Sequence, residues 1–359
     1  MIFHKALLRE LATAALPTFL VLLGITLTTQ LVKLLGQAAS GAITSLGIIA
    51  LLGFTVLNYL PVLLSLTLFI AVLMTLTRSY RDSEMVVWFS SGLGLMRWMR
   101  PVLMFAAPLV FTIALLSLVL SPWAINKAEE FRQLMNMRDD VSAITPGVFR
   151  ESSRGDRVYF VEEVEGEQNY VANVFVSSTQ HQKLGIMVAR RGYQETQPNG
   201  DRFLVLMNGR RYEGEAGTPE YKIYEFDRYA MRIDTGVAEA RPPTTKTLST
   251  PDLIRDRNAN NLAEFSWRIG LPLSALILSV LAIPLSFVNP RAGRSMNLVL
   301  ALLIYMTYSN LLSIAQAYIA QSRIGVSVGL WGVHGLMILV LLVLFYRRLV
   351  VGSLWRRLR

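Results

Sequence analysis

The chain has 359 residues, of which 53% are hydrophobic and 17% charged, with a formal net charge of +10 and no cysteine. The lack of cysteine excludes disulfides, thiol catalysis and cysteine-ligated metal sites. The apolar excess argues against a soluble domain with one large core and favours a protein that crosses a membrane several times.

Six charge-free apolar stretches occur along the chain, three before and three after a polar insert of about 140 residues. Each reaches the roughly 20 residues that a helix needs to cross about 30 Å of hydrocarbon. They are Leu11–Val32, Leu46–Thr77, Pro101–Asn126, Ile269–Pro290, Ser295–Ser322 and Ile324–Tyr346. The first stretch is too long for the apolar region of a signal peptide, so we expect it to remain as an anchor.

Basic residues concentrate in alternate connections between these spans. Thirteen Lys and Arg residues lie at the two ends of the chain and after the second and fourth spans, whereas the short connections on the other side hold only Arg323. Because cytoplasmic connections carry the excess of Lys and Arg, both termini are predicted to be cytoplasmic, with the insert across the membrane. The insert Asn126–Ser266 has 19 basic and 22 acidic residues, which predicts no basic face for nucleic acid.

The connection between the second and third spans predicts a short helix over about 82–91. Asp82 or Ser83 can cap it, and Gly92 can end it. Either its apolar face rests in the lipid headgroups, or it docks a cytoplasmic partner whose arginine pairs with Glu84. The apolar residues beside Glu84 are Met85, Trp88 and Phe89. The residues alone leave both interpretations open.

The insert predicts an antiparallel β domain of the sandwich, jelly-roll or open-barrel kind. Turn signals at Pro198–Asp201 and at Asn208-Gly209 separate neighbouring runs of β-branched and aromatic residues. These runs are Arg157–Val164, Tyr170–Ser177, Leu184–Arg190, Arg202–Met207 and Tyr221–Ile233. The predicted organisation is therefore residues 1–125 for the first three spans, 126–250 for the β domain, 251–266 for a connecting helix and 267–359 for the last three spans with a basic tail.

The connecting helix is predicted to start at Thr250-Pro251-Asp252, because an N-cap candidate, a proline and an acidic residue follow one another there. We expect it to continue through Asn261–Phe265 into the fourth span. His334, inside the sixth span, is interpreted as a neutral residue that is hydrogen-bonded between helices rather than as a proton relay.

Lys33 lies at the outer end of the first span, where a positive charge runs against the topology bias. Its stem can extend to place the ammonium at the interface. Alternatively, the ammonium faces a cavity between helices and meets an anionic lipid headgroup.

Motifs for catalysis are missing from the sequence. It has no P-loop and no nucleophile signature, and its three histidines lie far apart. We therefore expect no catalytic residue, no metal site and no ATP site in this chain. Two other protein classes remain: a membrane tether or receptor that displays a β domain without transport, and an intramembrane enzyme, which the uncharged spans disfavour.

Three motifs together resemble the LptF/LptG permeases of lipopolysaccharide export, and the resemblance covers the whole chain. They are Leu31–Gly36, Ser83–Val87 with Ser91–Leu93, and Trp267-Arg268 followed by Val288–Arg294, the last being closer to the LptF branch. The resemblance implies six transmembrane helices, three plus three, around an inserted all-β, jellyroll-like periplasmic domain. It also implies an inner-membrane subunit of an ABC transporter in a Gram-negative cell, which passes lipopolysaccharide to a periplasmic bridge toward the outer membrane.

The partners implied by the resemblance are an LptG permease as the other half of a heterodimer, a dimer of the ATPase LptB, LptC, lipopolysaccharide and membrane lipids. ATP and magnesium would be bound by the ATPase, with no cofactor on this chain. Glu84 matches the glutamate of a coupling helix that seats in the ATPase, and the residues predicted to surround that contact are Arg81, Asp82, Met85 and Trp88. Lys33 matches a cation that meets lipid A phosphates, and Gln30 occupies a neighbouring position where some members carry a second cation. Arg291 and Arg294 match the family motif, but are expected to serve as topological anchors.

Overall fold

The computed structural model describes residues 2–39, 43, 47–92, 94–142, 147–151, 157–165, 170–180, 183–197, 202–215, 221–233, 244–287 and 294–357. The chain divides into two compact units. The membrane unit comprises Met1–Glu130 and Pro243–Arg359, and the β unit comprises Phe131–Pro242.

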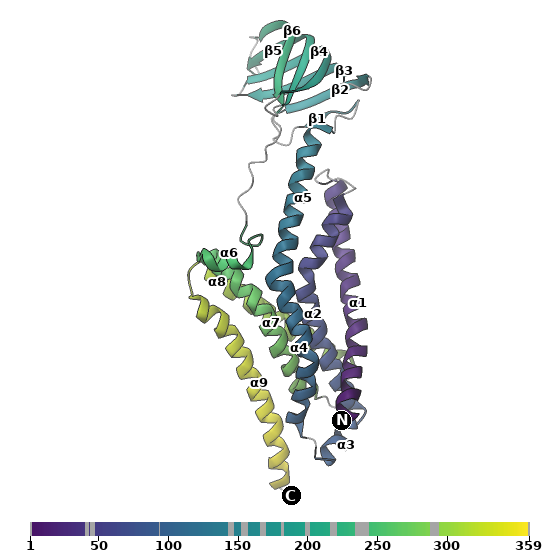
Figure 1. Ribbon diagram of the computed structural model, residues 1–359, viewed down its shortest axis with the longest axis vertical. Helices are drawn as coiled ribbons and strands as arrows, with labels where there is room; N and C mark the ends of the chain where they lie inside the picture. Colours follow the sequence, from purple (N-terminus) through teal and green to yellow (C-terminus); the bar gives the residue numbers. More distant parts are fainter. Residues whose placement is uncertain are drawn as a thin grey trace. The chain divides into compact units, whose positions relative to one another are not determined.

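Among the described residues, six helical segments are long and apolar enough to cross a membrane, which confirms the predicted three-plus-three arrangement (Figure 1). The first two spans are α1 (Ile2–Ala39) and α2 (Gly47–Arg81). The third is continuous through the short helix η1 (Leu95–Trp98), α4 (Met99–Leu115), the π-helix η2 (Leu116–Leu120) and α5 (Ser121–Ser142). The last three are α7 (Ala259–Leu285), α8 (Arg294–Ala320) and α9 (Val326–Arg357).

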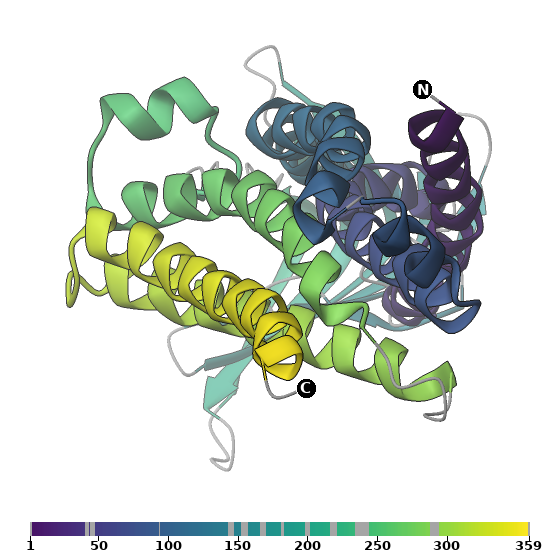
Figure 2. The same cartoon turned by 90° about the horizontal axis from the view of Figure 1, so that it is seen from below.

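The core of the membrane unit forms around α2 and α7. Their most apolar segments are 67% buried, against 6% for α1 and between 22% and 28% for the other three spans. Figure 2 shows the first three spans, in purple to blue, beside the last three, in green to yellow. The outward faces of α1, α8 and α9 are apolar and exposed, so they require lipid or other transmembrane helices as neighbours.

Two helices, not one, lead into the fourth span, so the predicted continuous connecting helix is wrong. The first is α6 (Thr250–Arg255), whose N-cap is Ser249 instead of the expected Thr250. The chain becomes extended at Asp256, and α7 then begins after Asn258, whose side chain accepts a hydrogen bond from the Asn261 amide at 2.8 Å. Asparagine is a preferred N-cap, and its side chain starts a new helix here.

The described residues of the β unit form one curved antiparallel sheet, which confirms the inserted all-β domain (Figure 1). Its strands are β1 (Arg150–Glu151), β2 (Arg157–Glu165), β3 (Tyr170–Gln180), β4 (Lys183–Thr196), β5 (Arg202–Glu215) and β6 (Tyr221–Ile233). Each described strand pairs with its neighbours in sequence, so the jellyroll-like domain is a meander over the part of the chain that is described. Alternate residues such as Val174, Val176 and Leu206 form its core.

The predicted hairpin turn at Asn208-Gly209 is wrong, because β5 continues through these residues. Asn208 has a positive φ of 52°, and Asn173 of β3 has a φ of 49°. Asn173 and Asn208 lie opposite one another across β4. The flanking residues show this alignment, because Ala172 pairs with Arg191 and Arg191 with Met207, while Val174 pairs with Ala189 and Ala189 with Gly209. The Asn-Gly pair therefore kinks the strand without ending it. The other predicted turn, Pro198–Asp201, lies outside the described residues.

Replacing Gly209 by alanine is expected to destabilise the β unit by about 1–3 kcal/mol, the usual cost of overpacking. A Cβ at this position would lie 2.6 Å from the Val188 carbonyl oxygen and 2.5 Å from Phe226 Cζ. The carbonyl belongs to the paired strand, so it cannot retreat without loss of strand pairing. Hydrogen exchange of β5 and β6 amides should become faster in this variant.

Gly185→Ala is the matched control, because its Cβ would meet only the movable Ser178 hydroxyl at 3.3 Å, with the next atom at 3.6 Å. Unchanged protection of β5 and β6 in Gly209→Ala would contradict the close approach seen at Gly209.

Candidate functional site

A seven-residue helix, α3 (Glu84–Ser90), forms in the connection between the second and third spans. It begins after Ser83, whose φ is 60°, and the side-chain cap expected from Asp82 or Ser83 is not formed. Gly92 ends the helix as predicted, with a φ of 84° and an amide that donates to the Phe89 carbonyl at 3.1 Å. A left-handed residue at this position favours glycine.

The inward side of α3 anchors it to the membrane unit. Met85 is 2% exposed within the main core, and Trp88 packs against that core. These two residues, which the sequence placed at the partner contact, therefore hold the helix in position instead of facing outward. The outward side presents Val86 and Val87, each 66% exposed, which the sequence analysis did not single out.

One cation is shared by two carboxylates beside α3. Arg78 Nη2 at the end of α2 lies 2.8 Å from Glu10 Oε1 of α1 and 3.4 Å from Glu84 Oε1 of α3. The longer contact is with Glu84, whose side chain is 40% exposed, so its oxygens can accept further hydrogen bonds from a partner. Arg81 and Asp82 pair with each other at 3.3 Å.

Aromatic contacts join α3 to the second triplet of spans. Tyr80 of α2 lies 6.4 Å from Phe89 of α3 and, edge-on, 5.4 Å from Phe287 just after α7, measured between ring centroids. The Arg348 guanidinium of α9 lies 4.0 Å from the centroid of the Phe287 ring. Through Tyr80, α3 is therefore connected to side chains of both the first and the second triplet of spans.

Lys33 lies on an open side of α1, where its side chain is exposed and has no ion-pair partner among the described residues. Gln30, one turn earlier, is half-buried. Glu10 and Lys33 are separated by about 35 Å of helix at 1.5 Å per residue. The helix that pairs with Arg78 at one end thus carries Lys33 near its other end.

His334 is completely buried between the last three spans. Its Nδ1 shares a hydrogen bond with the Tyr308 hydroxyl of α8, and Gly270 of α7 lies beside its other ring nitrogen. The expected hydrogen bond between helices is therefore present. Among the described residues, no group of three or more His, Asp or Glu side chains is placed to hold a metal ion.

A family model described as "Lipopolysaccharide export system permease LptF/LptG" matches residues 5–347. The chain belongs to the LptF/LptG family of lipopolysaccharide export permeases. The protein "Lipopolysaccharide export system permease protein LptF" of Escherichia coli K12 is 26% identical over 347 residues, which cover 96% of this chain and 94% of that protein. Proteins of the same name from Escherichia coli O157:H7 and Shigella flexneri match to the same extent.

The motifs that resembled the family occupy separate places in this LptF/LptG permease. Leu31–Gly36 lies in the C-terminal part of α1, Ser83–Val87 covers the start of α3, and Trp267-Arg268 lies in α7. Arg291 and the side chain of Arg294 lie outside the described residues. The whole-length match confirms the predicted family and a multi-pass membrane permease.

Proposed function

We propose that this LptF/LptG permease is the transmembrane subunit of an ABC transporter that extracts lipopolysaccharide from the inner membrane. It passes the lipid to a bridge of periplasmic β domains toward the outer membrane. The observation that carries the proposal is α3, which is anchored through Met85 and presents Glu84 beside the exposed Val86 and Val87. A carboxylate next to a small apolar face suits docking on a protein partner that offers an arginine.

Two features support the proposed partners: the sequence has no P-loop, and several transmembrane helices have exposed apolar faces. Because its sequence has no P-loop, a dimer of the ATPase LptB would bind ATP and magnesium, and this chain would bind no cofactor. The open apolar faces of α1, α8 and α9 suit an LptG permease, the single helix of LptC and membrane lipids. The distribution of basic residues supports a cytoplasmic location for both termini and α3 and a periplasmic location for the β unit.

The contacts around α3 can transmit its movement to the transmembrane helices. When ATP brings the two ATPases together, α3 moves with its partner as a rigid lever, because Met85 and Trp88 fix it to the core. Arg78 passes this displacement to Glu10 and hence to α1. Tyr80 passes it to Phe287 and the second triplet. The cavity between the two permeases narrows, and the lipid is displaced toward the periplasm.

Replacing Lys33 by glutamate is expected to weaken lipopolysaccharide binding. A basic residue near an anionic headgroup contributes about 1 kcal/mol, so reversing the charge should cost about 2 kcal/mol, roughly thirty-fold in affinity. The measurement is the amount of lipopolysaccharide that co-purifies with each complex.

Lys33→Arg keeps the charge and should retain lipopolysaccharide at the wild-type level. If Lys33→Glu also retains it, the ammonium lies at the outer interface without contact to the cargo.

Purification from inner membranes in mild detergent tests the proposed function. An ATPase and a second six-span permease should co-purify with the tagged chain in stoichiometric amounts. Recovery of the chain alone would overturn the proposal and favour a tether that displays a periplasmic β domain.

A further inference from the structure

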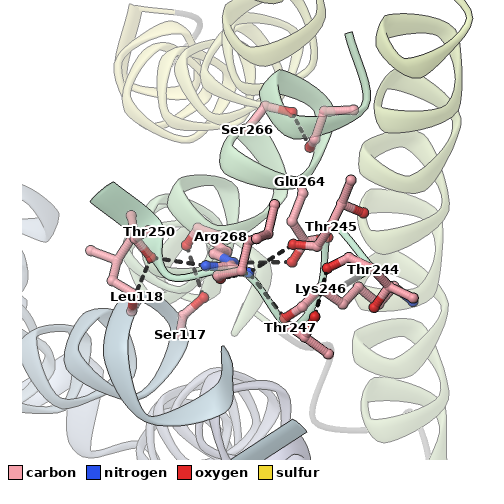
Figure 3. A network of polar contacts seen from close by, with 12 residues as sticks. Ser117, Leu118, Thr244, Thr245, Lys246, Thr247, Thr250, Glu264, Ser266 and Arg268 are labelled. Atoms are coloured by element: carbon pink, nitrogen blue, oxygen red, sulfur yellow. Dashed lines mark hydrogen bonds and ion pairs between the residues drawn. The ribbon is translucent and has the colours of Figure 1, made fainter. Parts of the chain in front are cut away.

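Arg268 lies at the meeting point of segments that are far apart in sequence (Figure 3). It is 2% exposed, although it lies on the transmembrane helix α7. Its Nε donates to Glu264 Oε1 at 3.0 Å, one turn earlier on the same helix. The other oxygen of Glu264 accepts from Gln316 Nε2 of α8 at 3.4 Å. The buried charge of Arg268 is therefore paired with Glu264, and Glu264 links the pair to the neighbouring span α8.

The remaining donors of Arg268 hold the segment through which the chain returns from the β unit. Nη1 donates to Thr250 Oγ1 at 3.0 Å. Nη2 donates to the carbonyls of Leu248 at 3.1 Å and Lys246 at 3.2 Å, with a longer contact to Thr245 at 3.4 Å. Four of its five side-chain hydrogen bonds therefore go to residues 245–250. The planar guanidinium can bond to several acceptors at once, which the ammonium of a lysine cannot reproduce in this geometry.

The same group of residues holds the third span, through which the chain leaves toward the β unit. Ser117 Oγ donates to the backbone carbonyl of Arg268 at 3.0 Å, and Thr250 Oγ1 donates to the Leu118 carbonyl. Ser117 and Leu118 belong to η2, the π-helical turn of this span. Single π-helical turns within α-helices often occur at functional sites, where they allow a helix to bend. Here the turn is bonded directly to α7 and to Thr250.

Both chain connections to the β unit thus begin from one buried anchor in the membrane unit. We propose that Arg268, acting through Thr250, is a positioning residue for lipid transport, and this inference rests on the proposed function. The anchor holds the outgoing π-helical turn and the returning segment 245–250 at a fixed separation. Movement of the spans then reaches the β unit instead of being absorbed by rotation at η2 or in the returning segment.

Thr250→Val tests this inference most cleanly. The substitution removes the bond to Leu118 and the acceptor for Arg268 Nη1, but it keeps the side-chain shape and the Arg268–Glu264 pair. Thr247→Val is the matched control, because the Thr247 hydroxyl donates only to the Thr244 carbonyl three residues earlier. The complex is reconstituted with its ATPase in proteoliposomes, and lipopolysaccharide transferred per ATP hydrolysed is measured.

We expect this ratio to fall roughly fivefold in Thr250→Val, the lower end of typical couplings between sites, with assembly and ATP hydrolysis unchanged. Thr247→Val should behave as wild type. A parallel fall of assembly, hydrolysis and transfer would show a merely structural role and overturn the inference. An unchanged ratio would also overturn it.

A distance measurement separates this inference from the proposed function. Because the chain contains no cysteine, spin labels can be attached to cysteines introduced at Val328 of α9 and Asp227 of β6, both exposed. In the assembled complex, Thr250→Val and Arg268→Ala should broaden the distribution of label distances, and Thr247→Val should not. Equal widths in all variants would overturn the positioning role. A wild-type complex that transfers no lipid would contradict the proposed function, and the label distances would still decide the role of Arg268.

Discussion

Replacing Glu84 by alanine is expected to remove most of the affinity of this permease for the proposed ATPase partner. Loss of one partner from a buried, hydrogen-bonded charge pair costs about 2–5 kcal/mol, roughly thirty-fold to a few thousand-fold in affinity. The membrane unit should stay folded, because Arg78 keeps its shorter contact with Glu10 at 2.8 Å. Quantitative co-purification of the ATPase with the tagged permease in detergent measures the effect.

Ser90→Ala is the control for this experiment. Ser90 is exposed on the same helix, and its hydroxyl donates only to the Val87 carbonyl of α3 itself. ATPase recovery should therefore match the wild type. If Glu84→Ala recovers as much ATPase as Ser90→Ala, α3 rests in the lipid headgroups and does not dock a partner.

A second large effect is expected from Glu264→Ala, which leaves the guanidinium of Arg268 buried without its carboxylate. Removing one member of a buried ion pair destabilises proteins by about 3–5 kcal/mol. The two side chains are 9% and 3% exposed and 3.0 Å apart, so little water is available to replace the lost contact. The unfolding temperature of the detergent-solubilised protein, followed by tryptophan fluorescence, should fall by several degrees.

The exposed Lys127–Glu130 pair provides the comparison for Glu264→Ala. These side chains are 45% and 48% exposed, and such pairs contribute about 0–1 kcal/mol. Glu130→Ala should therefore leave the unfolding temperature nearly unchanged. Equal unfolding temperatures for the two variants would show that water reaches Arg268 and that the pair is not buried in solution.

The six spans and the inserted β domain could be predicted because hydropathy and strand periodicity are properties of neighbouring residues. The end of α3 could also be predicted, because Gly92 readily adopts the left-handed conformation that ends the helix. The two-residue strand β1 is too short to show a period. The Asn-Gly pair at 208–209 is typical of a hairpin turn, but a residue with a positive φ also occurs at a kink within a paired strand, as Asn208 does here.

The sequence could not show which side of α3 faces a partner. A helix of seven residues has about two turns, so it carries too few positions for its apolar period to be determined. Only the core contacts of Met85 separate the anchoring side from the exposed side with Val86 and Val87. The role of Arg78 was also missed, because one arginine near a span end is indistinguishable from a topological anchor until Glu10 and Glu84 are placed beside it.

The network around Arg268 depends on contacts between residues that are far apart in the chain. Ser117 and Arg268 are separated by 151 residues, and Thr250 and Leu118 by 132. Such pairings arise from the packing of the third span on the fourth, and no local pattern reports them. In the sequence, Arg268 is recognised only as part of a family motif, whereas its side chain is buried and makes several hydrogen bonds.

The central claim, ATP-driven export of lipopolysaccharide, is tested most directly by release of labelled lipopolysaccharide from proteoliposomes that contain this permease, an LptG partner and the ATPase. The account predicts transfer to a soluble periplasmic β-domain acceptor that requires ATP hydrolysis and is lost in Glu84→Ala. Equal transfer with and without ATP, or full transfer by Glu84→Ala, would contradict it.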